Sequence, residues 1–150
     1  QLFVIWFCVF NLIRNKHMSQ LTYKVYHKAF EPEAVHIANV YIDSDVPTLK
    51  ALEEVFRKTN NVEGSWSLGP KLTRYEDEYD DSYEPFTQPK TIEEDNLDYF
   101  KNVEVVKHLR INREDDLMKY YGHRSTSVGD YVVVEGRTHT CENMGWGGIA

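Results

Sequence analysis

A group of hydroxyl, guanidinium and carboxylate side chains precedes a hydrophobic run near the end of this 150-residue chain. Arg124 is followed by three consecutive hydroxyl residues and then, a few positions on, by Gly129 and Asp130. A guanidinium beside hydroxyls and backbone amides has the chemistry to hold a phosphate. In the competing interpretation Arg124 pairs with an acid such as Asp130 and the hydroxyls close a turn. We expect this structural role, because neither GxxxxGK[ST] nor GxGxxG occurs in the chain.

The other residues capable of chemistry lack the spacing of a site. Six histidines are scattered without an HxxxH pattern, and His139 with Cys141 would supply two ligands on one side of a strand, which is too few for a metal site. Acidic pairs such as Glu93 and Glu94 are typical of surface charge, and no Ser/His/Asp order with a nucleophile-elbow glycine is present. We therefore expect no catalytic residue, no metal and no cofactor, so the chain is not predicted to be an enzyme.

Composition predicts one globular domain. Hydrophobic residues make up 41% of the chain and aromatic residues 13%, and the formal net charge is −7. This content is enough for a core. The negative charge disfavours coating of nucleic acid through a global positive field. The two cysteines lie far apart and predict no disulfide scaffold.

The first 17 residues differ from the rest. An apolar run from Leu2 to Ile13 is followed by Arg14 and Lys16. It is shorter than the ~20 residues of a spanning helix, and its basic residues follow the apolar stretch, unlike those of a signal peptide. We expect residues 1–17 to lie upstream of a natural start at Met18, with a fragmentary membrane anchor as the alternative. Residues 18–150 are expected to form one domain with no membrane association.

Hydrophobic periodicity from residue 18 onward predicts an α+β fold. Alternation predicts a small, mostly antiparallel sheet, with an amphipathic helix on one face and a C-terminal hairpin whose turn is Glu135-Gly136. An SH3-like or partly closed barrel around this hairpin is the alternative. A short helix after Asn112 is also predicted, whereas the strand order is not. The predicted strands are 21–30, 35–42, 103–111 and the hairpin 130–141, and the predicted main helix is 47–59.

Two loop residues carry structural expectations. Trp66 lies among the turn residues Gly64, Gly69 and Pro70, and because large aromatic side chains are usually buried we expect it to fill part of the core. Gly129 is expected to supply a backbone angle or a close approach that a side chain would forbid.

An acidic insert spans residues 76–98. It holds ten acidic residues and Lys90, a net charge of −9 that leaves +2 for the remainder of the chain. A solvated flexible loop is the simplest interpretation. The alternative is a rigid acidic surface that imitates the phosphates of duplex DNA, spaced ~1.7 Å per charge along its axis. The candidate acidic surface comprises Glu76, Asp77, Glu78, Asp80, Asp81 and Glu84.

The C-terminal region carries a resemblance. Residues 124–136, RSTSVGDYVVVEG, together with Met144-Gly145-Trp146, resemble a signature of small uncharacterised bacteriophage and plasmid proteins. They resemble more loosely the YodL-type domain of mobile elements. Residues 59–67 are also similar to a segment of the phage proteins, and the acidic insert has no counterpart. The resemblance implies a phage or mobile-element accessory protein in the cytoplasm of a bacterial host, and it implies no mechanism.

Three functional hypotheses follow. The first is a non-catalytic module that binds a protein partner, with candidate residues Arg124, Ser125, Ser127, Asp130, Trp146 and Trp66. The second is an acidic DNA mimic that inhibits a nucleic-acid-binding host enzyme. The third is nucleic-acid binding through a local basic patch formed by Arg110, Arg113, Lys119, His123, Arg124 and Arg137, with Tyr120 and Tyr121 for stacking. The sequence leaves the oligomeric state open.

Overall fold

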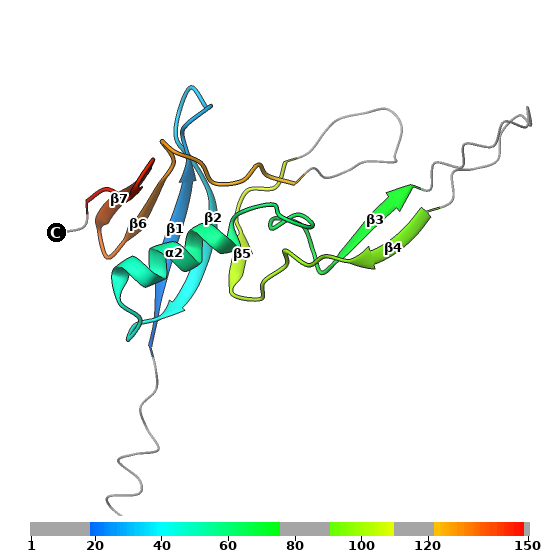
Figure 1. Cartoon of the computed structure of the whole chain (residues 1–150), viewed down its shortest axis with the longest axis horizontal. Helices are drawn as coiled ribbons and strands as arrows, with labels where there is room; N and C mark the ends of the chain where they lie inside the picture. The colour runs from blue at the N-terminus through cyan, green and yellow to red at the C-terminus, as the bar shows by residue number, and fades with distance from the viewer. Residues whose placement is uncertain (1–18, 76–90, 110–121, 149–150) are drawn as a thin grey trace, which may run out of the picture.

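The computed structural model describes residues 19–75, 91–109 and 122–148. These residues form a six-stranded antiparallel sheet, one helix and a separate two-stranded sheet (Figure 1). The predicted α+β class is confirmed, and the linear strand order describes an open sheet instead of the alternative barrel. In sheet order the strands are β5 (Val103–Val105), β2 (Val35–Asp43), β1 (Gln20–His27), β6 (Tyr131–Val134), β7 (Arg137–Glu142) and β8 (Gly145–Trp146).

The central pair β1 and β2 forms where the sequence predicts strands, but β1 ends at His27 and not at residue 30, because the Lys28 and Ala29 N–H groups donate to Asp130. Side chains alternate along β1, so that Tyr23 and Val25 are buried while Lys24 is exposed. A bulge then shifts the register, because Val25 pairs with Ala38 whereas the next residue, Tyr26, pairs with His36. The extra residue, Ile37, is buried together with Ala38. The bulge thereby returns His36 to the opposite face of the sheet.

Helix α2 (Thr48–Lys58) covers one face of the sheet (Figure 1). It agrees with the predicted helix over residues 47–59. Its buried residues Ala51, Leu52 and Val55 join the sheet in one core. The helix ends at Thr59, which has a φ of −113° and whose hydroxyl donates to the Val55 carbonyl. Within the part of the chain that the structure describes, no helix has the length and apolar character needed to cross a membrane.

The C-terminal hairpin β6–β7 is confirmed, and its turn has a clear cause. Glu135 and Gly136 have φ values of 49° and 73°, the two positive angles of a type I′ turn, whose twist matches that of the flanking strands. The two-residue strand β8 then adds to β7 through the pairs Cys141–Trp146 and Glu142–Gly145.

The strand predicted over 103–111 is wrong in length. Pairing with β2 ends at Val105, since the N–H groups of Val106 and Lys107 both turn toward the Ile37 carbonyl oxygen, at 2.9 and 3.4 Å. This carbonyl belongs to the β2 bulge, so regular pairing ends there. The short helix predicted after Asn112 lies outside the described residues.

The long excursion after α2 contains a second sheet that the sequence did not predict. β3 (Lys71–Tyr75) pairs with β4 (Thr91–Asp95), so the flexible-loop interpretation is wrong for residues 91–98. Two side chains just after β4 fasten it to the preceding loop. The Asp98 carboxylate accepts the N–H groups of Val62, Glu63 and Gly64 at 2.7–3.0 Å. Asn96 accepts from the Ser65 N–H and donates to the carbonyls of Ser65 and Gly69.

Candidate functional site

Arg124 and Asp130 form a bidentate ion pair. The Arg124 Nη1 and Nη2 atoms lie 2.6 and 2.8 Å from the two Asp130 carboxylate oxygens. The Asp130 side chain is completely buried, whereas 27% of the Arg124 side chain is exposed. Planar guanidinium and carboxylate groups match each other in this geometry. Arg124 is therefore engaged inside the protein, in the structural role expected from the sequence.

Asp130 also fastens its loop to the end of β1. Its Oδ1 atom accepts the backbone N–H groups of Lys28 and Ala29 at 2.7 and 2.9 Å, and its Oδ2 atom accepts that of Ser127 at 2.8 Å. Burial opposes ionisation of this carboxyl, but Arg124 and these amides outweigh it and hold the pKa of Asp130 at about 2. The carboxylate is thus ionised, and both of its oxygens accept hydrogen bonds from within the protein.

The glycine of this loop behaves as predicted. Gly129 adopts φ +94°, and a Cβ atom placed on it would lie 3.3 Å from the Cβ of Ala29. Both the backbone angle and the close approach to the end of β1 therefore favour glycine.

An aromatic cluster lies beneath the loop. Trp66 is buried, as predicted, and stacks on His123 with ring centroids 5.7 Å apart. Its indole N–H donates to the Arg124 carbonyl at 3.0 Å. His27 meets the Trp66 and His123 rings edge-on. Trp66 therefore joins the 59–70 loop to the 122–130 loop and offers no exposed ring to a partner.

The two imidazoles of this cluster are held neutral. Burial, followed by the Arg124 guanidinium, lowers the pKa of His27 to about 4, although Asp130 pulls it upward. Burial also lowers the pKa of His123, whose Nε2 atom bonds to the Lys107 carbonyl. Burial thus disfavours the charged form of both rings.

The hydroxyls of the loop serve turns and cross-links. Ser125 Oγ accepts the Asn61 N–H at 2.9 Å, and Ser127 Oγ donates to the Ser125 carbonyl at 3.2 Å. The Thr126 and Thr59 hydroxyls lie 2.8 Å apart in the interior. The RSTSVGD segment therefore builds the fold, and the geometry gives no support to phosphate binding by it.

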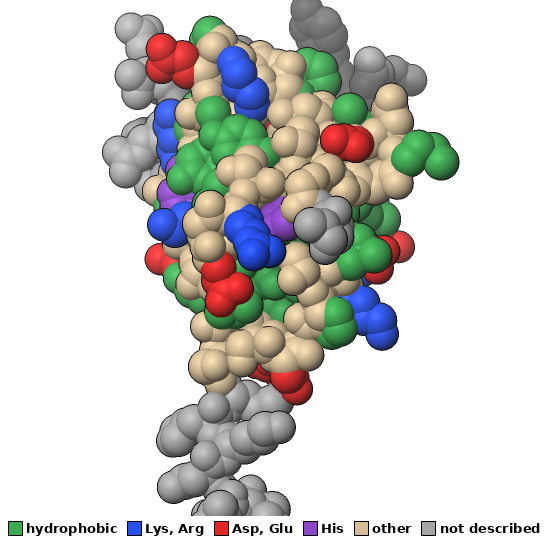
Figure 2. All heavy atoms as spheres, turned by 90° about the vertical axis from the view of Figure 1, so that its left-hand side faces the viewer, with side chains coloured by type: hydrophobic (Ala, Val, Ile, Leu, Met, Phe, Trp, Pro, Cys, Tyr) green, Lys and Arg blue, Asp and Glu red, His purple; other side chains and the backbone are tan. Residues whose placement is uncertain are grey.

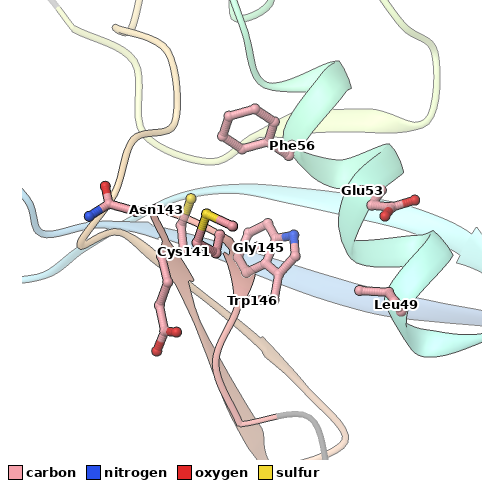
Figure 3. Close-up of a pocket in the computed structure, with 9 residues that line it drawn as sticks. Leu49, Glu53, Phe56, Cys141, Asn143, Gly145 and Trp146 are labelled. Atoms are coloured by element: carbon pink, nitrogen blue, oxygen red, sulfur yellow. The ribbon is translucent and has the colours of Figure 1, made fainter.

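Trp146, one of the predicted interaction residues, lines a surface groove. The groove has a volume of about 590 Å³ and lies between α2 and the β7–β8 turn. In Figure 3 the Trp146 ring faces the helix, with Phe56 and Leu49 on the helix side. Its lining residues are Leu49, Glu53, Phe56, Cys141, Glu142, Asn143, Met144, Gly145 and Trp146.

Apolar side chains in this groove are exposed to solvent. Met144 is 99% exposed, Leu49 47% and Phe56 38%, while Phe56 meets the half-buried Trp146 ring edge-on at 6.4 Å. Leu49 and Phe56 belong to the apolar stripe of α2, but unlike Leu52 and Val55 they are not buried in the core. Two features of the sequence indicate the groove: the apolar stripe of α2 is wider than its buried part, and the apolar Met144 lies in a polar turn.

The described residues do not form the proposed acidic surface or the proposed basic patch. The six residues of the proposed acidic surface lie outside the described ranges. So do Arg110, Arg113, Lys119, Tyr120 and Tyr121 of the proposed basic patch, while His123 and Arg124 are engaged inside. Figure 2, which views the β7 side, shows charges of both signs scattered among hydrophobic side chains, without a field of one sign.

His139 and Cys141 are both buried on the same side of β7, as their spacing predicts. Burial raises the pKa of the Cys141 thiol, so it behaves as a small apolar side chain. Across the ranges 19–75, 91–109 and 122–148 there is no group of three or more His, Cys, Asp or Glu residues arranged to hold a metal ion.

Comparison of the chain with protein-family models, with curated proteins and with solved structures finds no match to any of them.

Proposed function

We propose that this protein is a non-catalytic interaction module, and that the groove between α2 and the β7–β8 turn binds a peptide segment of another protein. The observation that carries the proposal is the exposure of Met144, Leu49 and Phe56 around one concave surface. Apolar patches of this kind, rimmed by polar residues, are typical of interaction sites. The resemblance to phage and plasmid proteins supports a phage or host protein as the partner.

The charge of the groove defines the partner chemistry. Glu53 and Glu142 are the charged residues among those that line it. A matching segment therefore presents a large apolar side chain with Lys or Arg beside it. A second copy of this chain suits the groove less well, because it would bring the same two carboxylates toward each other.

Selection from a displayed library of random 12-residue peptides tests this proposal. The full chain is the target, and we expect enriched sequences with an aromatic or aliphatic residue flanked by basic residues. Chemical shifts of the labelled protein should then change at residues 49–56 and 141–146. Met144→Ala should weaken the selected peptide about fivefold or more, since central apolar anchors carry most interface energy.

Val62→Ala is the matched control, because Val62 is also highly exposed, at 76%, and does not line the groove. It should leave peptide affinity unchanged. Failure to enrich any consensus, shifts confined to other surfaces, or equal binding by Met144→Ala would contradict the proposal.

A further inference from the structure

The face of the sheet opposite α2, here called the open face, carries a row of aromatic rings. Register places His36 of β2 beside Tyr26 of β1, and Tyr26 beside Tyr131 of β6. Both pairs are stacked, with ring centroids 4.9 Å apart and interplanar angles of 23° and 11°. All three side chains are half-buried. We call these three residues the aromatic row.

Among the described residues, no further ring stacks on either end of the aromatic row. The cross-strand neighbour of Tyr131 on β7 is Thr140, a small side chain beside the outer ring face. At the other end, pairing of β5 with β2 stops at Ala38 and does not extend to His36. A planar group can therefore extend the stack at either end, and every nucleobase has such a planar face.

A polar row lies next to the aromatic row. Register aligns Glu104, Asn39 and Lys24 across β5, β2 and β1. The Asn39 side-chain NH₂ donates to Glu104, and the Asn39 Oδ1 atom accepts from the His36 Nε2–H at 2.8 Å, while the Tyr41 hydroxyl donates to Glu104. The Glu104 carboxylate is thus held by two neighbours, and the open face keeps hydrogen-bonding groups beside its rings.

Lysines flank the aromatic row. Lys24 precedes Tyr26 by two residues on β1, and Lys28 follows it by two. Both are exposed. Outside the acidic insert the chain carries a net charge of +2. The Lys28 ammonium also donates to the Glu31 and Pro32 carbonyls at 3.2 and 2.8 Å, so Lys24 supplies the main positive charge that complements a phosphate backbone passing along the row.

We propose that the open face binds a short single-stranded nucleic acid, with bases stacking on Tyr131 and His36 and phosphates contacting the flanking lysines. A helix-backed antiparallel sheet with aromatic residues on its central strands is a general platform for unpaired bases. This site is separate from the peptide groove and from the basic patch considered from the sequence, so either proposal can fail without the other.

Fluorescence anisotropy of fluorescein-labelled U8 and dT8 with the full chain, at 20 and 200 mM salt, tests the site. We expect binding that weakens with salt. Tyr131→Ala should weaken it about 5- to 150-fold, the range for loss of one base–aromatic stack. Tyr131→Phe should bind as the original protein does, which separates stacking from folding. Lys24→Gln should reduce the salt dependence.

Tyr99→Ala is the control, since Tyr99 is 37% exposed, lies between β4 and β5, and does not belong to the aromatic row. It should bind normally. Absence of oligonucleotide binding at 20 mM salt would overturn the proposal, as would equal binding by Tyr131→Ala and Tyr131→Phe. A loss of binding in Tyr99→Ala equal to that in Tyr131→Ala would overturn it as well.

Discussion

Arg124 and Asp130, six residues apart, close their own loop through two parallel hydrogen bonds of 2.6 and 2.8 Å. The same carboxylate accepts the Lys28 and Ala29 amides at the end of β1. One buried acid therefore joins a local loop to a strand about 100 residues earlier in the chain. This dual role explains why a segment rich in hydroxyl and charged side chains contributes to the fold.

Asp130→Asn should strongly destabilise the protein. The substitution removes the charge that Arg124 pairs with and turns one carboxylate oxygen into an amide that cannot accept a backbone N–H. Loss of one partner of a buried pair costs about 3–5 kcal/mol. Urea unfolding followed by tryptophan fluorescence measures the change.

Asp45→Asn provides the matched control, because Asp45 is exposed. Its free energy of unfolding should change by less than about 0.5 kcal/mol. Similar values for the two variants would mean that the Asp130 contacts contribute little to stability.

Mild acid should destabilise the fold through His27. Its pKa is about 4 in the native protein and 6.5 ordinarily, so between these values the unfolded chain binds a proton that the native state does not. The contribution of His27 to the free energy of unfolding is fully present above pH 6.5, and it falls by up to roughly 3 kcal/mol as the pH drops to 4. Asp130, with a pKa of about 2, contributes to this dependence only at lower pH.

The slope of stability against pH is the quantity to compare. His27→Gln removes the titrating group, so its free energy of unfolding should depend less on pH between 6.5 and 4 than that of the original protein. His123, which also has a lowered pKa, should supply the remaining slope. Identical slopes in the two proteins would exclude His27 as the source.

Local signals explain which elements the sequence predicts well. The β6–β7 hairpin depends on neighbouring residues, since Glu135-Gly136 specifies the turn and Val132 and Val134 alternate inward. Helix α2 likewise follows from its apolar stripe. By contrast, β3 and β4 have few apolar residues, and their loop is fixed by Asp98, more than thirty residues from the amides that it binds.

Long-range register explains what the sequence could not predict about the sites. The aromatic row exists only because the β2 bulge brings His36 opposite Tyr26 and because β6 pairs with β1. The groove requires β8 to return toward α2. Strand order and bulges arise from contacts between distant residues, and a periodicity of two along one strand carries no information about its neighbours.

Gly129→Ala should destabilise the protein more than Gly136→Ala. Both glycines have positive φ, 94° and 73°, but only at Gly129 does an added Cβ meet a neighbour, Ala29. The left-handed angle alone costs about 1–2 kcal/mol, and the contact adds to it at Gly129. Thermal unfolding of the two variants gives the comparison, and a larger loss for Gly136→Ala would contradict the role assigned to the close approach.

Asp98→Ala should loosen the loop that follows α2 while leaving the main sheet intact. Three backbone N–H groups, those of Val62, Glu63 and Gly64, lose their acceptor together, and each unsatisfied group costs about 1–3 kcal/mol unless water replaces the carboxylate. Hydrogen exchange of these amides should accelerate at least about tenfold, whereas amides of β1 should be unaffected.

Asp95→Ala, which removes an exposed partner of Lys71, is the control and should leave exchange at 62–64 unchanged. Unaltered protection in Asp98→Ala would show that the loop is held by its other contacts, chiefly those of Asn96 and Trp66, and equal acceleration in both variants would show that β4 as a whole, and not this one carboxylate, orders the loop.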